Sequence, residues 1–201
     1  NAHLPHATDD LGERWEMLAN MAKPYPCGIV IHPALDGCLE ITRQPGFNAA
    51  KITRVSLSVD PLCLYLCDRP TPPDSQLAQV SLQHWVAATL VRGAAGIAEG
   101  NEAAVADPDI QAVRGRIEAS PDEKVGRAGA IVRVEQSEGA SFEHHVDHGI
   151  GSLQRPMSPA ELDAKFMAQA LMTLPEAGAT AVLQRCKDMP QLKNAAEVMM
   201  V

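Results

Sequence analysis

Alternation of apolar and polar residues is clearest in the middle of the chain. Val55, Leu57 and Val59 fall on one side of an extended segment and polar residues on the other, which is typical of a half-buried strand. Strands are predicted at residues 52–59, 116–119, 130–135 and 141–147. Gly139 lies between the last two, so these two strands should form a hairpin with the glycine in its turn.

Helical periodicity and capping residues surround these strands. Helices are predicted at residues 11–21, 33–43, 76–92, 107–113, 158–172 and 177–187. Pro33 suits the first position of its helix, Asp107 is a favourable N-cap, and Gly93 is a natural stop. Ser158 and Glu161 have the spacing of a capping box, which opens the next helix.

The order of these elements predicts an α+β fold. A small sheet should have helices packed on one face, and further helices should follow toward the C-terminus. We expect residues 1–22 to be a lead-in segment, residues 23–157 to form the α+β domain, and residues 158–201 to form the C-terminal helices. The change from strands to helices after residue 157 suggests this boundary.

Composition and charge narrow the class of protein. The chain has 201 residues, 46% of them hydrophobic, which is enough for a core. Its net charge of −8 and its lack of a basic block disfavour nucleic acid as a partner, and no apolar run suggests a membrane span. The five cysteines suggest free thiols in a cytoplasmic protein. A zinc site at the isolated pair Cys63 and Cys67 is disfavoured.

A first candidate site is the segment from Lys23 to Asp36. Prolines stiffen the chain between Lys23 and His32, and His32 stands just before Pro33, where a helix is predicted to begin. A helix N-terminus with a lysine nearby favours a carboxylate, and a histidine can move a proton near neutral pH. The alternative is a helix-capping histidine beside a surface lysine.

A second candidate is His84, which lies on an otherwise apolar predicted helix. A lone histidine in that setting is more often a core residue with its hydrogen bonds satisfied than a functional group. Its spacing alone therefore does not decide between the two roles.

The third candidate segment follows the predicted hairpin. It contains side chains that commonly bind metals: His144, His145, Asp147 and His148. Adjacent residues of a strand face opposite sides, so His144 and His145 should not share a site, and no metal is expected. Gly149, Gly151 and Arg155 could instead form an anion-binding turn.

Three strings of this sequence resemble the MmgE/PrpD family. They are GERWEMLANMAKPYPCGIVIHPALDG, SQLAQVSLQHWVAATLVRG and RPMSPAELDAKF. The resemblance runs from about Gly12 to the C-terminus. It implies the C-terminal part of such a protein, in which residues 23–157 are the smaller, lid domain. Residues 158–201 would then complete a large all-helical domain that is missing here or is a separate subunit.

The resemblance also implies a site and its chemistry. The family includes 2-methylcitrate dehydratase, cis-aconitate decarboxylase and iminodisuccinate epimerase, which form homodimers, act on small polycarboxylates, and need neither a metal nor an organic cofactor. By motif match, His32 and Lys23 would be catalytic, whereas His84 and Asp36 would contact or position the substrate. Arg155 is also expected to bind the substrate, although its loop departs from the Asn-Pro that is commoner in the family.

Three functions remain open at this point. The favoured one is a dehydratase or other lyase of the 2-methylcitrate dehydratase type, which abstracts a proton from a di- or tricarboxylate. An epimerase or isomerase of the iminodisuccinate epimerase type needs the same residue types. The third is a non-catalytic fragment that binds only a partner subunit or a polycarboxylate. The chain alone should be inactive, because the family's site also needs groups from the helical domain.

Overall fold

The computed structural model describes residues 9–199, and these divide into two compact units, of which the first ends at residue 156 and the second begins at residue 157. The first unit has four strands: β1 (Ile52–Val59), β2 (Ile117–Pro121), β3 (Ala130–Gln136) and β4 (Ser141–Val146). Its helices are α1 (His32–Thr42), α2 (Pro61–Cys67), α3 (Ser75–Ala78), α4 (Leu82–Arg92), α5 (Glu102–Ala106) and α6 (Pro108–Arg114). The second unit contains α7 (Pro159–Ala170) and α8 (Glu176–Lys187).

The strands form one mixed sheet in the order β2-β1-β3-β4. β1 runs parallel to β2 and antiparallel to β3, and β3 pairs antiparallel with β4. The predicted hairpin is confirmed: Glu138 and Gly139 both have positive φ in its turn, and the Gln136 N–H donates to Ala140 O at 2.8 Å. The predicted α+β class is also confirmed.

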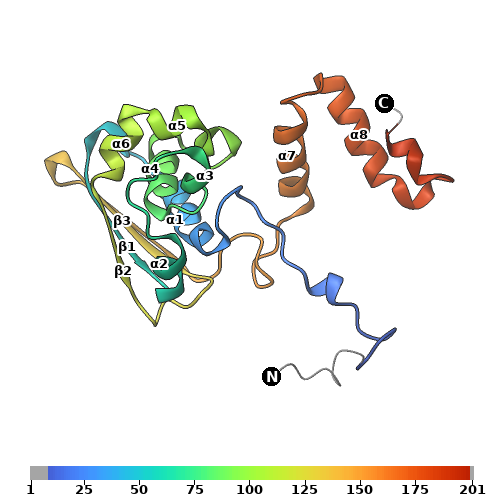
Figure 1. The fold of residues 1–201 in the computed structure, drawn as a ribbon, viewed down its shortest axis with the longest axis horizontal. Helices are drawn as coiled ribbons and strands as arrows, with labels where there is room; N and C mark the ends of the chain where they lie inside the picture. The colour runs from blue at the N-terminus through green and yellow to red at the C-terminus, as the bar shows by residue number, and fades with distance from the viewer. Residues whose placement is uncertain (1–8, 200–201) are drawn as a thin grey trace. The chain divides into compact units, whose positions relative to one another are not determined.

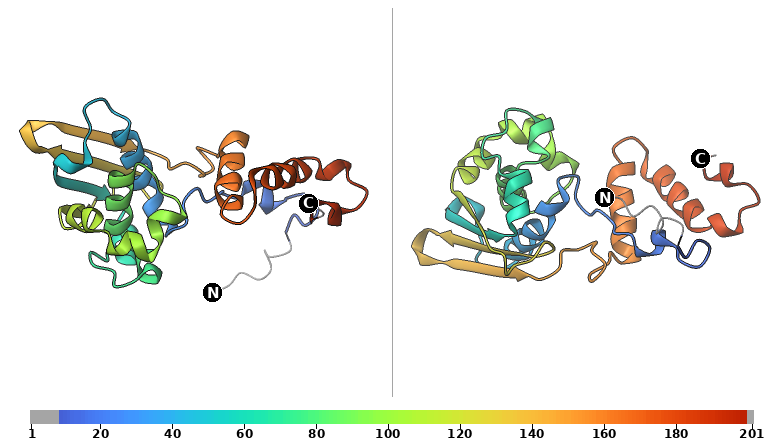
Figure 2. Two further views of the ribbon diagram at one scale, coloured as in Figure 1. Left: turned by 90° about the horizontal axis from the view of Figure 1, so that it is seen from above. Right: turned by 60° about the horizontal axis from the view of Figure 1, so that its bottom comes forward.

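The two faces of the sheet differ in polarity, as the alternation predicted. Val55, Leu57 and Val132 are buried beneath helices, which cover one face (Figures 1 and 2). The opposite face is polar, and Arg54 forms an ion pair with Glu118 across β1 and β2 at 2.6 Å. The burial pattern therefore fixes the register, because a slip of one residue would exchange the two faces.

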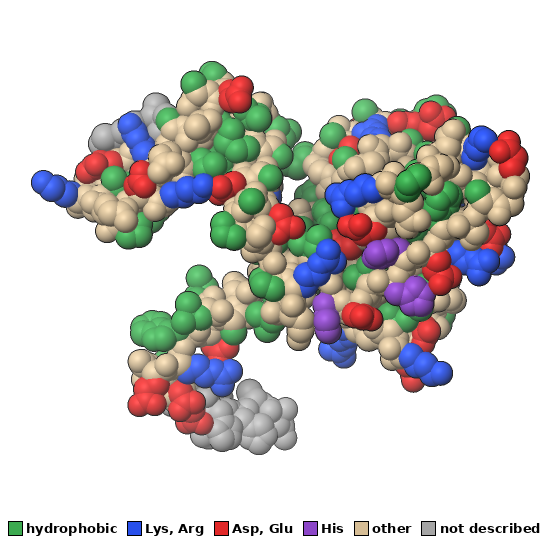
Figure 3. Space-filling view, turned by 180° about the vertical axis from the view of Figure 1, so that it is seen from behind, with side chains coloured by type: hydrophobic (Ala, Val, Ile, Leu, Met, Phe, Trp, Pro, Cys, Tyr) green, Lys and Arg blue, Asp and Glu red, His purple; other side chains and the backbone are tan. Residues whose placement is uncertain are grey.

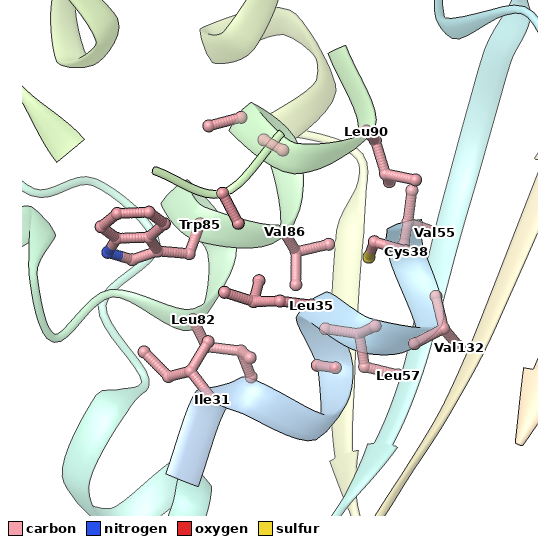
Figure 4. Packing of buried hydrophobic residues seen from close by; sticks show 14 of the residues in the cluster. Ile31, Leu35, Cys38, Val55, Leu57, Leu82, Trp85, Val86, Leu90 and Val132 are labelled. Carbon is pink, nitrogen blue, oxygen red and sulfur yellow. The ribbon is translucent and has the colours of Figure 1, made fainter. Parts of the chain in front are cut away.

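The core lies between the sheet and two helices, α1 and α4. α1 packs on β3 and β4, and α4 packs on α1 and α6. Figure 4 shows Leu35 of α1 and Val86 of α4 side by side in this core. Each such side chain contributes roughly 1.5–3 kcal/mol by leaving water. Gly37 brings α1 close to the sheet, since a Cβ there would lie 2.7 Å from Val132 Cγ2.

Two predicted helices differ from the structure. α4 begins at Leu82 instead of residue 76, because the Ser81 hydroxyl accepts the His84 N–H at 3.1 Å and caps a new helix. The helix predicted at 11–21 is reduced to one 3-10 turn at Glu16–Ala19. Trp15 and Leu18 are exposed there, so no tertiary packing stabilises a longer helix.

Two helices were not predicted, α2 and the short α5. α2 follows β1 directly: Pro61 occupies its first turn, and the Asp60 carboxylate accepts the Leu62 N–H at 2.8 Å. Cys63 and Cys67 lie on its buried side, and all five cysteines of the chain are free thiols. Burial raises the pKa of the Cys63 thiol to about 12, so this group stays protonated near neutral pH.

The second unit is a pair of helices. Ser158 and Glu161 form the predicted capping box at the start of α7. An ion pair between Lys187 and Asp163 joins α8 to α7. Ala179 is buried in α8, whereas several large apolar side chains of this unit remain exposed. None of the helices in the described part of the chain is long and apolar enough to cross a membrane.

Candidate active site

His32 is the first residue of α1 and lines a pocket of about 260 Å³ in the first unit. A 3-10 turn, Ile29–Ile31, leads directly into the helix, and Pro33 fixes the first helical turn. His32 is buried, and its Nε2 lies 3.4 Å from Cys27 O. The His32 and Tyr25 rings form a T-shaped pair with their centroids 5.2 Å apart. These contacts hold the imidazole in one orientation at the pocket wall.

The other walls come from segments far along the chain. Ala130 at the start of β3 pairs with Val146 at the end of β4, so the loops that flank this hairpin lie together. Gly149 N–H donates to Ala128 O at 2.8 Å and links the two loops. Because α1 packs on β3 and β4, its N-terminus and His32 lie against both loops.

Gly151 allows the chain before α1 to close the pocket. Its φ of +85° is left-handed, and a Cβ there would lie 1.9 Å from Ala22 O. The Ala22 N–H donates to Gly151 O at 3.1 Å. Residues 149–152 use their own N–H groups within the protein, so these amides do not form the predicted anion-binding turn.

Asp36 lies on α1 one helical turn after His32 and contacts several segments around the pocket. Its buried carboxylate accepts the Tyr25 hydroxyl and the Ile150 N–H, the latter at 2.6 Å, and lies 3.8 Å from the Arg155 guanidinium. Three segments of the pocket wall therefore meet at one carboxylate. Asp36 contacts Tyr25, and the Tyr25 ring contacts His32, so this network positions the histidine through an aromatic ring.

Burial dominates the electrostatics of this network. It raises the pKa of Asp36, an effect that the hydrogen bonds from Tyr25 and Ile150 and the charge of Arg155 oppose. Burial and the neighbouring carboxylate raise the pKa of Tyr25 well above its usual range. Tyr25 therefore remains a neutral hydroxyl that donates to Asp36.

The structure places the other predicted site residues outside this pocket. Lys23 follows Ala22 but is exposed and is not among the described residues that line the pocket. His84 is fully buried, and its Nε2–H donates to Glu99 O at 2.8 Å, while Nδ1 has no partner among the described residues. Burial lowers the pKa of His84, which keeps it neutral.

The third predicted segment forms a separate, shallow groove. Figure 3 shows histidines beside acidic and basic side chains on one face of the molecule. Residues of this groove include His144, His145, Asp147, His148 and Arg155. His145 faces solvent and lies 2.9 Å from Glu143, whereas His144 points to the other side of β4. Among residues 9–199, no cluster of three or more such side chains has the arrangement of a metal site.

Two residues of the site were missed by sequence reasoning. Tyr25 lies between two prolines, a position that fixes its backbone, yet its link to Asp36 depends on the packing of α1. Arg127, an exposed residue of the loop before β3, also lines the pocket. Its sequence signal is weak, since it consists only of the flanking Gly126 and Gly129, which suggest a tight turn.

A comparison with known families covers most of the chain. Residues 25–189 match the MmgE/PrpD C-terminal domain, and they include the pocket histidine, the sheet and both C-terminal helices. This chain belongs to the MmgE/PrpD family, as its motifs predicted. No match was found among curated proteins.

Proposed function

We propose that this chain supplies the pocket histidine of an MmgE/PrpD-type lyase that acts on a small polycarboxylate. The observation that supports it is the position of His32. This histidine is held at a helix N-terminus, in a largely apolar pocket, within the region that matches the family domain. The full enzyme would be a cytoplasmic homodimer that needs no cofactor and completes its site with a large helical domain.

The proposed reaction is elimination of water. A base removes a proton from the carbon next to a carboxylate, the electron pair of the C–H bond forms a C=C bond, and the neighbouring hydroxyl leaves after receiving a proton from an acid. His32 would take or give one of these protons. Lys23, an exposed residue next to Ala22 of the pocket lining, would bind a substrate carboxylate and stabilise the charge that develops there.

The test is His32→Asn in the chain joined to, or produced together with, an MmgE/PrpD helical domain. Turnover of a panel of small di- and tricarboxylates would be followed by the ultraviolet absorbance of the unsaturated product. General acid–base groups contribute roughly 10²–10⁴-fold, so kcat should fall by that order. His145→Asn, on the exposed side of β4, is the matched control and should keep full activity.

Two results would contradict the proposal. A near-normal kcat in His32→Asn would show that this histidine only shapes the protein. A fall in kcat together with a large loss in melting temperature would show a structural role, because Asn then fails to replace the packing of the ring. Absence of turnover on every substrate by the unmodified enzyme would count against the lyase assignment itself.

A further inference from the structure

Among the described residues that line the His32 pocket, basic side chains are present and acidic ones are absent. Most are apolar, including Val30, Leu62 and Ile150, and none is acidic. Two have side chains that can carry a positive charge, His32 and Arg127. Arg127 is exposed to solvent, so water hydrates its charge in the free protein, and an anion bound between it and the apolar wall is attracted more strongly than in open water.

Arg127 differs from the other arginines near the sheet. Arg133 lies 3.4 Å from Glu135, and Arg155 lies 3.8 Å from Asp36. In the described part of the chain, by contrast, no hydrogen bond or ion pair involves the Arg127 side chain. Its guanidinium therefore keeps all of its donors for a ligand or for water.

The backbone that carries Arg127 is held in place. The Gly129 N–H donates to Gly126 O at 3.2 Å, so Arg127 is the second residue of a tight turn. Gly126 has a φ of +72°, and a Cβ on Gly129 would lie 2.5 Å from Val125 O. A side chain at Gly126 would strain the backbone, and one at Gly129 would collide with it, so both glycines favour the turn that carries the arginine.

We infer that Arg127 binds one carboxylate of the substrate and selects for an anionic group in this pocket. The inference rests on the proposed function of the same pocket, to which it adds a specificity residue beside His32 in the pocket lining. A guanidinium can hold a carboxylate through two parallel N–H···O bonds, which fixes the orientation of the ligand as well as binding it. The apolar part of the substrate would lie against Val30, Leu62 and Ile150.

The experiment compares Arg127→Gln and Arg127→Lys with the unmodified chain. Binding of succinate, and of its uncharged dimethyl ester, would be measured by calorimetry at constant low salt in a buffer without carboxylates. Arg127→Gln should weaken succinate binding at least about tenfold, the usual effect of losing a charge-assisted hydrogen bond. Arg127→Lys should restore part of it, because the charge returns without the two-pronged geometry. Arg133→Gln, on the solvent face of β3, is the matched control.

The outcomes separate this inference from the proposed function. Equal succinate affinity in Arg127→Gln and the unmodified chain, no succinate binding by the unmodified chain, or equal binding of the diester would each overturn the role of Arg127. None of these binding results would contradict a catalytic role of His32 that is measured by kcat. Conversely, Arg127→Gln could lose succinate binding while the complete enzyme shows no turnover. That result would support the binding role of Arg127 and contradict the lyase assignment.

Discussion

Replacing Asp36 by alanine tests whether one buried carboxylate holds the pocket together. The change removes the acceptor of two buried donors, the Tyr25 hydroxyl and the Ile150 N–H, and leaves Arg155 without its partner. Because those donors come from two separate segments, the chain before α1 and the loop after β4, both segments would lose an anchor to α1.

The expected loss of stability follows from these contacts. Each buried donor left without an acceptor costs about 1–3 kcal/mol. Loss of the ion pair with Arg155 adds little to this cost, because the arginine side chain is about half exposed. Relief of the buried carboxylate, whose raised pKa shows that its burial is unfavourable, offsets part of this cost. We therefore expect Asp36→Ala to lower the free energy of unfolding by about 3 kcal/mol.

The assay is urea unfolding followed by the fluorescence of Trp85, which is buried in the same core. A double-mutant cycle with Tyr25→Phe should give a coupling energy of about 1–2 kcal/mol, because the two side chains share one hydrogen bond. Glu118→Ala removes an exposed ion pair with Arg54 and serves as the control, with an expected change of less than about 1 kcal/mol.

A small effect of Asp36→Ala on stability would refute this role of the carboxylate. If Asp36→Ala costs no more than Glu118→Ala, the buried carboxylate does not hold the walls. If the two single losses at Asp36 and Tyr25 simply add, the hydrogen bond between them contributes nothing. Either result would also remove the argument that Asp36 positions His32 through the Tyr25 ring.

Two further predictions concern a glycine and a histidine. Urea unfolding should show that Gly151→Ala lowers the free energy of unfolding by more than Gly46→Ala does. Both glycines have φ near +85°, where an alanine costs about 1–2 kcal/mol in backbone strain. Only at Gly151 would the new Cβ also collide with Ala22 O. The lowered pKa of His84 means that the unfolded chain takes up its proton first on acidification, so stability should fall as pH drops below the ordinary histidine value of about 6.5. His84→Gln should flatten this decline in pH-dependent unfolding; an unchanged slope would contradict it.

Local signals were enough to predict much of the fold. The alternation in Ile52–Val59 and the glycine turn at Gly139 act within a few residues, and both strands and hairpin are where they were expected. Pro33 likewise marks the start of α1 to within one residue. The start of α4 was misplaced because Asp74 and Ser81 are both good caps, and each caps its own helix, α3 and α4.

The pocket depended on contacts that no local signal contains. Lys23 and His32 are close in sequence, yet only His32 lines the pocket. Arg127 and Gly151 both line the pocket because the start of β3 pairs with the end of β4, which brings the two flanking loops together beside the N-terminus of α1. Such neighbours follow from strand pairing and helix packing, which a single sequence does not specify at this level of detail.

The position of β1 in the sheet has a consequence for how the chain acquires its fold. Val134 pairs with Phe142, a close neighbour in sequence, so the β3–β4 hairpin forms from local contacts. Val55 pairs with Ile117 and Val134, so β1 has no strand partner until the chain through α2–α6 and beyond has been synthesised. During translation the nascent β1 therefore presents an apolar, unpaired edge, and its docking, with its long loop closure, should limit the folding rate of this unit.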